Sequence, residues 1–544
     1  MLPSSFAILA ALRALGTTIA ILCHLTGCAP NGEVAGPMDG PESPAGVAGA
    51  SAGAGQAHGG NAPSEAGGGS GGAGGSNAVE GGAAGAAPGG ENVSRADDDP
   101  LPACSAPISV TSSAQLKQAL GAARPGDCIE LGDGGFDFPF ISAQGEPGAP
   151  IVITAKNPGK ARPASGLVFS KASYVAVQGL AWTGSEGVKV ADSDHVRITR
   201  CRFALKDASE QDWISVTGTS SHTRIDHNDL GPKRVVGNLI MLSGLDSRVV
   251  QHTRIDHNYF HDVEYTAGNG WETIRAGLSH LALSSGHTVI EHNLFERCGG
   301  DPETISIKSS DNIIRYNTIL DSKGQLVLRH GNRNSVYGNY LLGNDVDGTG
   351  GIRVCGQDHR IFSNYVQGVG TPAILLEAGD SDALDEAGTA HYRVYRTTVA
   401  FNTVVSARGI QVGGGGHDFS PVDSVVANNL VQASAANLIV ELGSPVNTSF
   451  IGNIVHPLEG GTTDMGGPGV GVTALDPGLL RNGLIFTLSA TSPAIDKADG
   501  IFEYVSADVA GRARRLPDVG AEEYSATQGP FPPLSAAEVG PSSP

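Results

Sequence analysis

The chain has 544 residues, of which 77 are glycine and only 5% are aromatic, a composition unlike that of an ordinary globular enzyme. Its formal net charge of -20 argues against nucleic acid as a general partner, because a phosphate backbone attracts basic surfaces. We therefore expect no nucleic-acid partner, and an acidic ligand would need a locally basic site on an acidic body.

The first 28 residues are interpreted as a lipoprotein-type signal peptide. An apolar stretch from Phe6 to Leu22 is followed by the tetrapeptide LTGC, which ends at Cys28 and resembles the cleavage box of bacterial lipoproteins. In that pattern Cys28 carries the lipid and anchors the protein to a membrane without spanning it. The sequence predicts an exported protein, either a lipoprotein of the bacterial cell envelope, with the outer membrane as the expected location, or an extracellular protein. An ordinary signal peptide is the alternative.

Residues 29–102 are rich in Gly, Ala, Ser and Pro and include the run GGGSGGAGGS. This composition cannot bury enough apolar surface to fold, so the sequence predicts a disordered tether. The folded part is expected at residues 103–525, followed by a disordered tail at residues 526–544. Cys104 and Cys128 flank the first ordered segment and are expected either as a disulfide or as buried thiols.

The folded part is expected to start with a short helix at residues 112–123, where Leu116 and Leu120 have helical spacing after a capping serine. A repeat with one recurrent asparagine per unit follows, at intervals of 22 to 38 residues. This pattern predicts an all-β fold, a single-stranded right-handed parallel β-helix with a short N-terminal capping helix. The asparagine amides are expected to pair from coil to coil. The recurrent residues are Asn228, Asn258, Asn293, Asn317, Asn339, Asn364, Asn402, Asn429 and Asn453.

Two runs of this repeat, ISIK and LVLR, end at Lys308 and Arg329, which are 21 positions apart. Their aliphatic residues would face the core, and the two cations would face solvent on the same side. Arg275 and Arg353 occur in similar runs, so four cations are expected in one column on neighbouring rungs. Because like charges on adjacent strands repel each other, such a column indicates a polyanionic ligand.

Acidic and amide side chains lie near these cations in the sequence. Asn269, Asp301 and Glu303 offer two carboxylates and an amide oxygen, which are hard ligands suited to calcium. From the residues alone, the alternative is that the carboxylates balance the charges of Lys308 and Arg329.

Three motifs then give a specific resemblance: NGWETIR, which ends at Arg275, DPETISIKSS around Lys308, and LRHGN, which contains Arg329. Together they resemble polysaccharide lyase family 6, which comprises alginate lyases and chondroitin B (dermatan sulfate) lyases. The likeness extends from Cys104 to Tyr524. It implies a lyase domain at residues 103–525 that acts on an acidic polysaccharide.

The resemblance also implies a role for each residue of the site. Lys308 corresponds to the general base that removes the C5 proton of a uronate, and Arg329 to the residue treated as the acid at the O4 leaving group. Asn269, Asp301 and Glu303 correspond to the calcium ligands that help to neutralise the substrate carboxylate, although the family usually has Glu where Asp301 stands. Residues expected to bind the substrate are Arg275, His330, Arg353 and Tyr392.

The chemistry agrees with these residue types. The amine of Lys308 must be neutral to act as a base, and the positive charges of Arg329 and a metal would lower its pKa. A guanidinium hardly deprotonates, so Arg329 is expected to stabilise developing charge. His330, Tyr392 or water is then the expected proton donor.

The leading hypothesis is therefore β-elimination on alginate. Dermatan sulfate is the alternative substrate, and its sulfates would call for more arginines, for which Arg333 and Arg360 are the candidates. A C5-epimerase, a pectinase-like hydrolase with paired carboxylates, and a surface protein that only binds polysaccharide are the remaining hypotheses.

Overall fold

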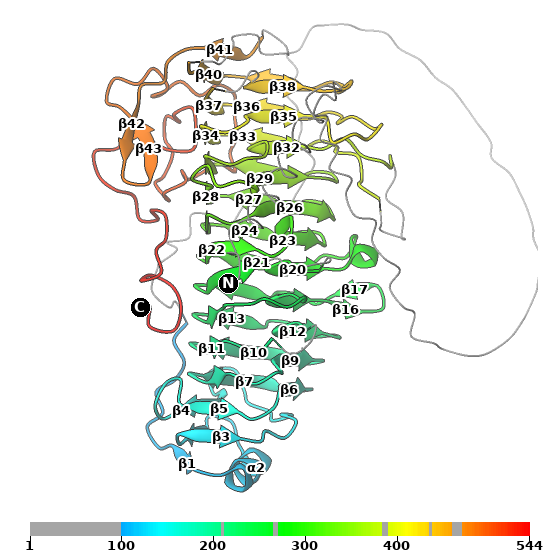
Figure 1. Ribbon diagram of the computed structural model, residues 1–544, viewed down its shortest axis with the longest axis vertical. Helices are drawn as coiled ribbons and strands as arrows, with labels where there is room; N and C mark the ends of the chain where they lie inside the picture. Colours follow the sequence, from blue (N-terminus) through cyan, green and yellow to red (C-terminus); the bar gives the residue numbers. More distant parts are fainter. Residues whose placement is uncertain (1–98, 208–210, 265–269, 383–389, 435–437, 460–469) are drawn as a thin grey trace, which may run out of the picture. The chain divides into compact units, whose positions relative to one another are not determined.

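The computed structural model describes residues 99–207, 211–264, 270–382, 390–434, 438–459 and 470–544. In these residues successive coils of the chain stack on one another and form three long sheets of parallel strands (Figure 1). This arrangement confirms the predicted all-β class and the right-handed parallel β-helix. The predicted signal peptide, and the tether up to residue 98, lie outside the described residues.

The first sheet contains 14 strands of the described chain, and each pairs in parallel with the strands of the coils before and after it. Its strands are β1 (Ile108–Val110), β2 (Cys128–Leu131), β4 (Ile151–Ala155), β7 (Ser173–Gln178), β10 (Asp194–Thr199), β13 (Arg224–Asp226), β18 (Arg254–Asp256), β21 (Val289–Glu291), β24 (Ile313–Arg315), β27 (Ser335–Tyr337), β30 (Arg360–Phe362), β33 (Thr398–Ala400), β36 (Val425–Ala427) and β39 (Ser449–Ile451).

The second sheet has 12 strands within the described ranges and follows the first sheet around each coil. Its strands are β8 (Ala181–Trp182), β11 (Arg202–Phe203), β14 (Asp229–Leu230), β19 (Tyr259–Glu264), β22 (Leu294–Gly299), β25 (Thr318–Leu320), β28 (Tyr340–Leu342), β31 (Tyr365–Gln367), β34 (Thr403–Val405), β37 (Leu430–Ala433), β40 (Asn453–Pro457) and β41 (Val472–Ala474).

The third sheet has 11 strands in the part of the chain that the structure describes, and it carries most of the predicted site residues. Its strands are β6 (Leu167–Ser170), β9 (Val188–Ala191), β12 (Ile214–Thr217), β15 (Ile240–Leu242), β20 (Ile274–Gly277), β23 (Glu303–Lys308), β26 (Gly324–His330), β29 (Thr349–Val354), β32 (Ile374–Leu376), β35 (Ile410–Val412) and β38 (Ile439–Glu441).

Smaller elements lie outside these sheets. The shorter elements are the parallel pair β3 (Gly134–Phe136) and β5 (Ala161–Pro163), the antiparallel pairs β16 (Gly244–Leu245) with β17 (Arg248–Val249) and β42 (Leu479–Asn482) with β43 (Ile485–Leu488), and the 3-10 turn η1 (Ser279–Leu281). The helix α2 (Ser113–Ala122) lies at the end of the stack that carries β1 (Figure 1). The Ser112 hydroxyl accepts from the Gln115 N–H, and Leu116 is buried, so α2 is the predicted capping helix.

The inside of the coils is filled by aliphatic side chains from all three sheets. At the corner between the first and second sheets, each recurrent asparagine from Asn228 to Asn429 donates its side-chain amide to the side-chain oxygen of the next. The same oxygen also accepts a backbone N–H, so this buried polar ladder is saturated with hydrogen bonds. The predicted asparagine ladder is thereby confirmed.

The register of the third sheet differs from the predicted one at the basic residues. The aliphatic pairs Ile305–Leu326 and Ile307–Leu328 align as expected, but a register shift follows, and Lys308 pairs with His330 instead of Arg329. One extra residue in a strand shifts every later side chain relative to its neighbour strand. The prediction that Lys308 and Arg329 occupy equivalent positions is therefore wrong.

The expected single column of four cations is also wrong. Arg275 pairs with Ser306, and Arg353 pairs with Val327, so these two arginines share one outward row of positions. Lys308 pairs with Gly277 and lies two residues further along its strand. The cations therefore form two separate rows on the third sheet, with Ser306 and Val327 between the two arginines.

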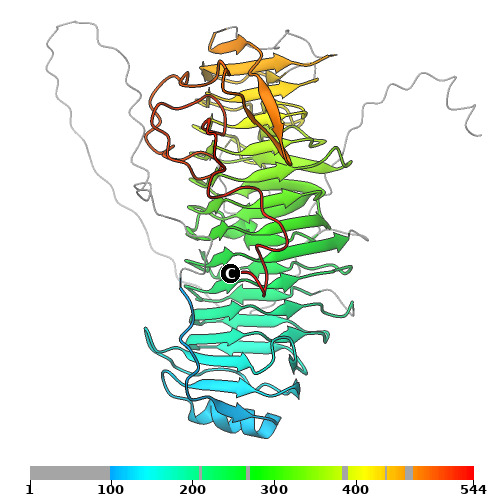
Figure 2. The same cartoon turned by 90° about the vertical axis from the view of Figure 1, so that its left-hand side faces the viewer.

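The segment at residues 526–544 is ordered on the outside of the coils, in contrast to the predicted disordered tail. Its path, red in Figure 2, follows the flank of the stack. Phe531 packs against the rings of His292 and Tyr316, Leu534 is buried in a cluster with Leu294, and the Leu534 N–H donates to a threonine hydroxyl of β25. Burial of a few apolar side chains against the coils therefore orders a segment whose composition favours disorder.

Cys104 and Cys128 are joined by a disulfide, which settles the choice between the two expected states of this pair. Cys201, Cys298 and Cys355 are buried free thiols. Within the described residues, no helix is long and apolar enough to cross a membrane.

Candidate active site

The two predicted catalytic cations lie on neighbouring strands of the third sheet, at the ends of β23 and β26. Lys308 is half-buried, and its ammonium makes no hydrogen bond or ion pair with the described residues. A cation that faces outward next to other charges without a partner of its own is available for a ligand or for proton transfer. Arg329, in contrast, is nearly buried and is held by its neighbours.

Glu303, at the start of β23, is the carboxylate that interacts with several cations of the site. Its Oε1 accepts from Arg353 Nη2 at 2.5 Å, and its Oε2 accepts from the Ser306 hydroxyl at 2.5 Å. Burial opposes ionisation of this carboxyl, but the charges of Arg353, Lys308 and Arg329 together with the Ser306 bond outweigh it and lower the pKa of Glu303. Glu303 is therefore a buried carboxylate that balances three cations.

Asp301 lies just before β23, and its surroundings raise its pKa, whereas those of Glu303 lower the pKa of Glu303. Its carboxylate accepts the N–H groups of Gly270, Trp271 and Glu303 at 3.1–3.2 Å. Burial raises the pKa of Asp301 to about 6, and the carboxylate of Glu272 adds to this effect. A carboxylate held by backbone N–H groups and crowded by other acids is a group that a bound cation would stabilise.

The carboxylates fit the hard ligand set that the sequence predicts for calcium. Asp301 is buried, and Glu303, two residues away, has a side chain that is 14% exposed. The charge of Glu303 adds to the rise in the pKa of Asp301. Hard carboxylate oxygens suit Ca²⁺. The third predicted ligand, Asn269, lies outside the described residues.

Arg275 is held in place by a carboxylate that the sequence analysis did not single out. Glu272 accepts from Nε and Nη2 of Arg275 at 2.9 and 2.8 Å, and it also accepts from the Asn238 side-chain amide at 2.9 Å. This two-pronged contact fixes the guanidinium, whose side chain is 18% exposed. Arg275 can therefore present its remaining edge to a ligand, as can Arg353, whose side chain is 20% exposed.

Arg329 is positioned by His330 and by the main chain of a later segment. Its Nη1 donates to His330 Nε2 at 2.8 Å and to the Ala390 carbonyl oxygen at 3.2 Å. The same Nε2 lies 3.0 Å from the Ala390 carbonyl oxygen. A guanidinium can only donate and a carbonyl can only accept, so the two contacts call for opposite protonation states of Nε2. His330 is fully buried, and burial together with the Arg329 charge lowers the pKa of His330 to about 2.

This burial corrects two expectations for His330. A side chain with no exposed surface does not present itself to a substrate, and an imidazole that stays neutral has no extra proton to donate. His330 instead positions Arg329. The register shift pairs His330 with Lys308, and the burial of His330 comes from the later segment that covers it, through the Tyr392 ring and the Ala390 carbonyl oxygen.

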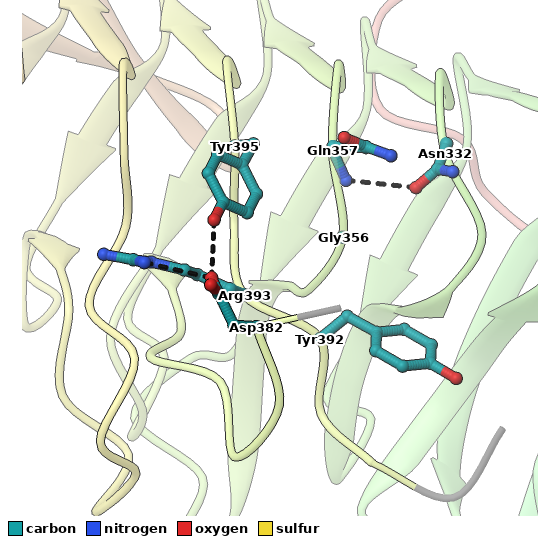
Figure 3. A pocket seen from close by; sticks show the side chains of 7 residues that line it. All are labelled: Asn332, Gly356, Gln357, Asp382, Tyr392, Arg393 and Tyr395. Atoms are coloured by element: carbon teal, nitrogen blue, oxygen red, sulfur yellow. Dashed lines mark hydrogen bonds and ion pairs between the residues drawn. The ribbon is translucent and has the colours of Figure 1, made fainter. Parts of the chain in front are cut away.

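Tyr392 lies beside this pair, with its ring centroid 5.4 Å from that of His330, and it is almost fully buried. It lines a pocket in which Asp382 accepts from Arg393 at 3.0 Å and from the Tyr395 hydroxyl at 2.5 Å, while the Tyr392 ring points away from that cluster (Figure 3). The pocket does not include Lys308 or Arg329. Tyr392 therefore stands between the pocket and the candidate active site.

Two acidic residues that hold the arginines were not predicted from the sequence. Glu272 holds Arg275, and Glu377 lies 3.9 Å from Arg353 while its other oxygen accepts from His391 at 2.9 Å. The His391 bond and the Arg353 charge overcome burial and lower the pKa of Glu377 to about 2. Glu272 lies within the NGWETIR motif and could have been found there, whereas Glu377 carries no motif.

Comparison with known proteins gives a family match. The model of the family described as Chondroitinase B matches residues 110–456. No curated protein matches the chain.

Solved structures give the same picture. The PL6 family alginate lyase AlyGC is 30% identical, with a TM-score of 0.64 over 71% of this chain and 56% of that one. This chain thus spans little more than half the length of that relative. A mannuronic acid specific family 6 lyase from human gut microbiota is 25% identical, with a TM-score of 0.58 over 68% of this chain and 92% of that one. A PL6 alginate lyase solved with a trisaccharide is 21% identical, with a TM-score of 0.60 over 70% and 91%, and it supports the fold alone.

Proposed function

Because this chain belongs to the chondroitinase B family, we propose that it is a polysaccharide lyase that cleaves a uronate-containing polysaccharide, alginate, by β-elimination. One observation carries the proposal. Lys308 lies unpaired among the described residues on the outer face of the third sheet, beside Arg329 and the buried carboxylate of Glu303. This is the arrangement that removal of a proton next to a carboxylate requires.

Lys308, as the general base, takes the C5 proton of the uronate. The C–H electron pair moves toward the C6 carboxylate, forms the C4–C5 double bond and expels the O4 oxygen, which takes up a proton. Arg329, fixed by His330 and by the Ala390 carbonyl, stabilises the negative charge that develops. His330 is unsuited as the proton donor since its pKa is about 2, which leaves Tyr392 or water.

Asp301 and Glu303, with Asn269 by resemblance, are the residues that would hold calcium. A calcium ion bound there would supply positive charge that neutralises the substrate carboxylate and makes the C5 proton more acidic. Arg353 and Arg275 are held by Glu303 and Glu272 on the same face, so they are already oriented to bind further carboxylates of the polymer.

Two arginines bear on the choice between alginate and dermatan sulfate. Arg333 donates to both oxygens of Asp311 at 2.7 Å, and Arg360 lies over the Tyr504 ring at 4.4 Å. Both candidates for sulfate binding thus have intramolecular partners, as Arg275 and Arg353 do, so these contacts do not separate the two polymers, and we propose alginate. The alginate lyases among the similar structures support the same choice. Dermatan sulfate is the second candidate, favoured by the description of the matching family.

We also propose that the protein is exported and anchored through a lipid on Cys28. The Cys104–Cys128 disulfide supports export, because disulfides persist in oxidising compartments. A Cys28→Ser variant should move from the membrane fraction to the soluble fraction of the producing bacterium. An unchanged distribution would contradict the lipid anchor.

The activity is tested by the ultraviolet absorbance of the unsaturated uronate product. Purified protein is incubated with alginate and, separately, with dermatan sulfate, each with and without a calcium chelator. Rising absorbance with alginate alone, reduced by the chelator, is the expected result. A rise with dermatan sulfate alone would identify dermatan sulfate, instead of alginate, as the substrate. No rise in absorbance with either polymer would overturn the proposal.

A further inference from the structure

Three side chains with metal-binding atoms meet one coil beyond the candidate active site. Cys355 follows β29, Glu377 follows β32, and His391 lies in the connection after β32. Glu377 Oε2 is 3.1 Å from Cys355 Sγ and 2.9 Å from His391 Nδ1, and Sγ and Nδ1 are 4.0 Å apart. We call these three residues the Cys–Glu–His cluster.

The size of this triangle suits a small tetrahedral metal ion. Zinc binds sulfur at about 2.3 Å and nitrogen or oxygen at about 2.0–2.2 Å, so two of its ligand atoms are roughly 3.3–3.6 Å apart. The three separations in the cluster, 2.9, 3.1 and 4.0 Å, bracket that range. Small side-chain rotations therefore suffice to bring all three atoms to bonding distance from one point.

We propose that the Cys–Glu–His cluster binds a divalent transition metal ion of the zinc type. The metal would take the place of the two hydrogens that now bind Glu377 Oε2. The thiol proton of Cys355 is released to solvent, the proton on Nδ1 of His391 moves to Nε2, and no group is oxidised or reduced. The proposal does not depend on the lyase activity, and thiolate and imidazole ligands select against calcium.

Charge in the surroundings is compatible with the ion. Glu377 Oε1 faces Arg353 Nη1 at 3.9 Å, so the carboxylate can bind the metal through Oε2 and keep that contact. One thiolate and one carboxylate cancel the two charges of the metal, so Arg353 would not face a net positive charge. Cys355 and Glu377 are buried, and His391, whose side chain is 19% exposed, provides the route from solvent.

A run of four glycines makes room beside the cluster. Gly413 to Gly416 all have positive φ angles of 81–92°. A Cβ on Gly415 would lie 2.8 Å from Glu377 Cγ, so this close approach requires glycine. The run leads to His417, whose ring centroid is 4.8 Å from that of His391. His417 or water would complete the coordination.

The test uses Co²⁺ as the probe on the purified, metal-stripped full chain. A thiolate bound to Co²⁺ gives an intense near-ultraviolet charge-transfer band, and we expect this band to saturate at one equivalent and to disappear when Zn²⁺ is added. Cys355→Ser should abolish the band. Cys298→Ser is the matched control, because Cys298 is also a buried free thiol, but its sulfur contacts the Thr273 and Ser322 side chains and the Glu296 carbonyl oxygen instead of a carboxylate and an imidazole. This control should keep the band.

The thiolate charge-transfer band also distinguishes Co²⁺ bound at the Cys–Glu–His cluster from Co²⁺ bound at a second group of possible ligands, which contains no sulfur. That group consists of His227, Asp256 and His257. If Cys355→Ser fails to fold, His391→Gln carries the test, because its partly exposed side chain tolerates exchange and its loss should weaken Co²⁺ binding at least tenfold. No charge-transfer band in the wild-type protein would overturn the site, as would a band that survives Cys355→Ser or unchanged affinity in His391→Gln. The three side chains would then be a hydrogen-bonded network only.

Discussion

Replacement of Lys308 by alanine separates a chemical role of this residue from a structural one. A general base contributes roughly 10²–10⁴-fold to the rate of proton transfer. We therefore expect kcat on alginate to fall by that factor, which corresponds to about 2.7–5.5 kcal/mol of lost transition-state stabilisation. KM should change much less, because Arg275 and Arg353 still bind the polymer through contacts that Lys308 does not make.

The structure predicts little effect of the same substitution on stability. Lys308 is half-buried and has no hydrogen bond or ion pair with the described residues, so the free energy of unfolding should change by less than about 1 kcal/mol. Glu303 loses one of the positive charges that lower its pKa, but Arg353 and Ser306 still bind it. The variant should therefore fold and bind alginate without cleaving it.

The assay combines product absorbance with urea unfolding. Lys189→Ala is the matched control, because Lys189 is an exposed lysine on β9 of the same sheet, aligned through Ser215 and Met241 with Arg275 and well outside the site. It should keep both activity and stability. A Lys308→Ala enzyme with more than a few per cent of wild-type kcat would refute the base assignment. A loss of several kcal/mol of stability would show instead that Lys308 has structural contacts.

Three further predictions follow from burial and hydrogen bonding. Because the pKa of Asp301 is raised to about 6, protons compete with calcium for this carboxylate below that pH. Calorimetry should therefore show about tenfold tighter calcium binding at pH 7 than at pH 5. A pH-independent affinity would contradict a role for Asp301 in the calcium site. Asn339→Ala removes the amide that bonds Asn364 and the Ile314 carbonyl, so urea unfolding should show a loss of about 2–4 kcal/mol, whereas an unchanged midpoint would mean that the ladder does not stabilise the fold. Removal of residues 526–544 takes away three buried apolar side chains, Phe531, Leu534 and Val539, and should cost roughly 4.5–9 kcal/mol. Unchanged stability would mean that the segment does not bind in solution.

The proposed zinc-type site and the predicted calcium site would lie at opposite ends of one chain of contacts. Glu377 faces Arg353, and Arg353 bonds Glu303, which lies beside Lys308. A change of charge at Glu377 would therefore act through Arg353 on Glu303, in the proposed catalytic site. Metal analysis of the purified protein would show both ions in one preparation.

The fold was readable from the sequence because each coil repeats the same local rule. Alternating aliphatic and polar residues require strands with one buried face, and an asparagine at every coil corner pairs with the next only if the coils stack. The capping helix followed from its own serine cap and apolar spacing. These signals recur once per coil along the sequence, so no distant contact was needed to detect them.

The site was only partly determined in this way. Equal spacing of 21 positions aligned Lys308 with Arg329, but the register shift that pairs Lys308 with His330 is decided by packing between strands and leaves no mark in the sequence. Glu377 and His391 come from a long connection with no repeat, and their contact with Cys355 exists only because the coils stack. Likewise, the composition of residues 526–544 favours disorder, while Phe531 is held by a hollow that only the folded coils provide. Local pattern fixes strands and their inward faces, whereas contacts between distant segments depend on the assembled coil.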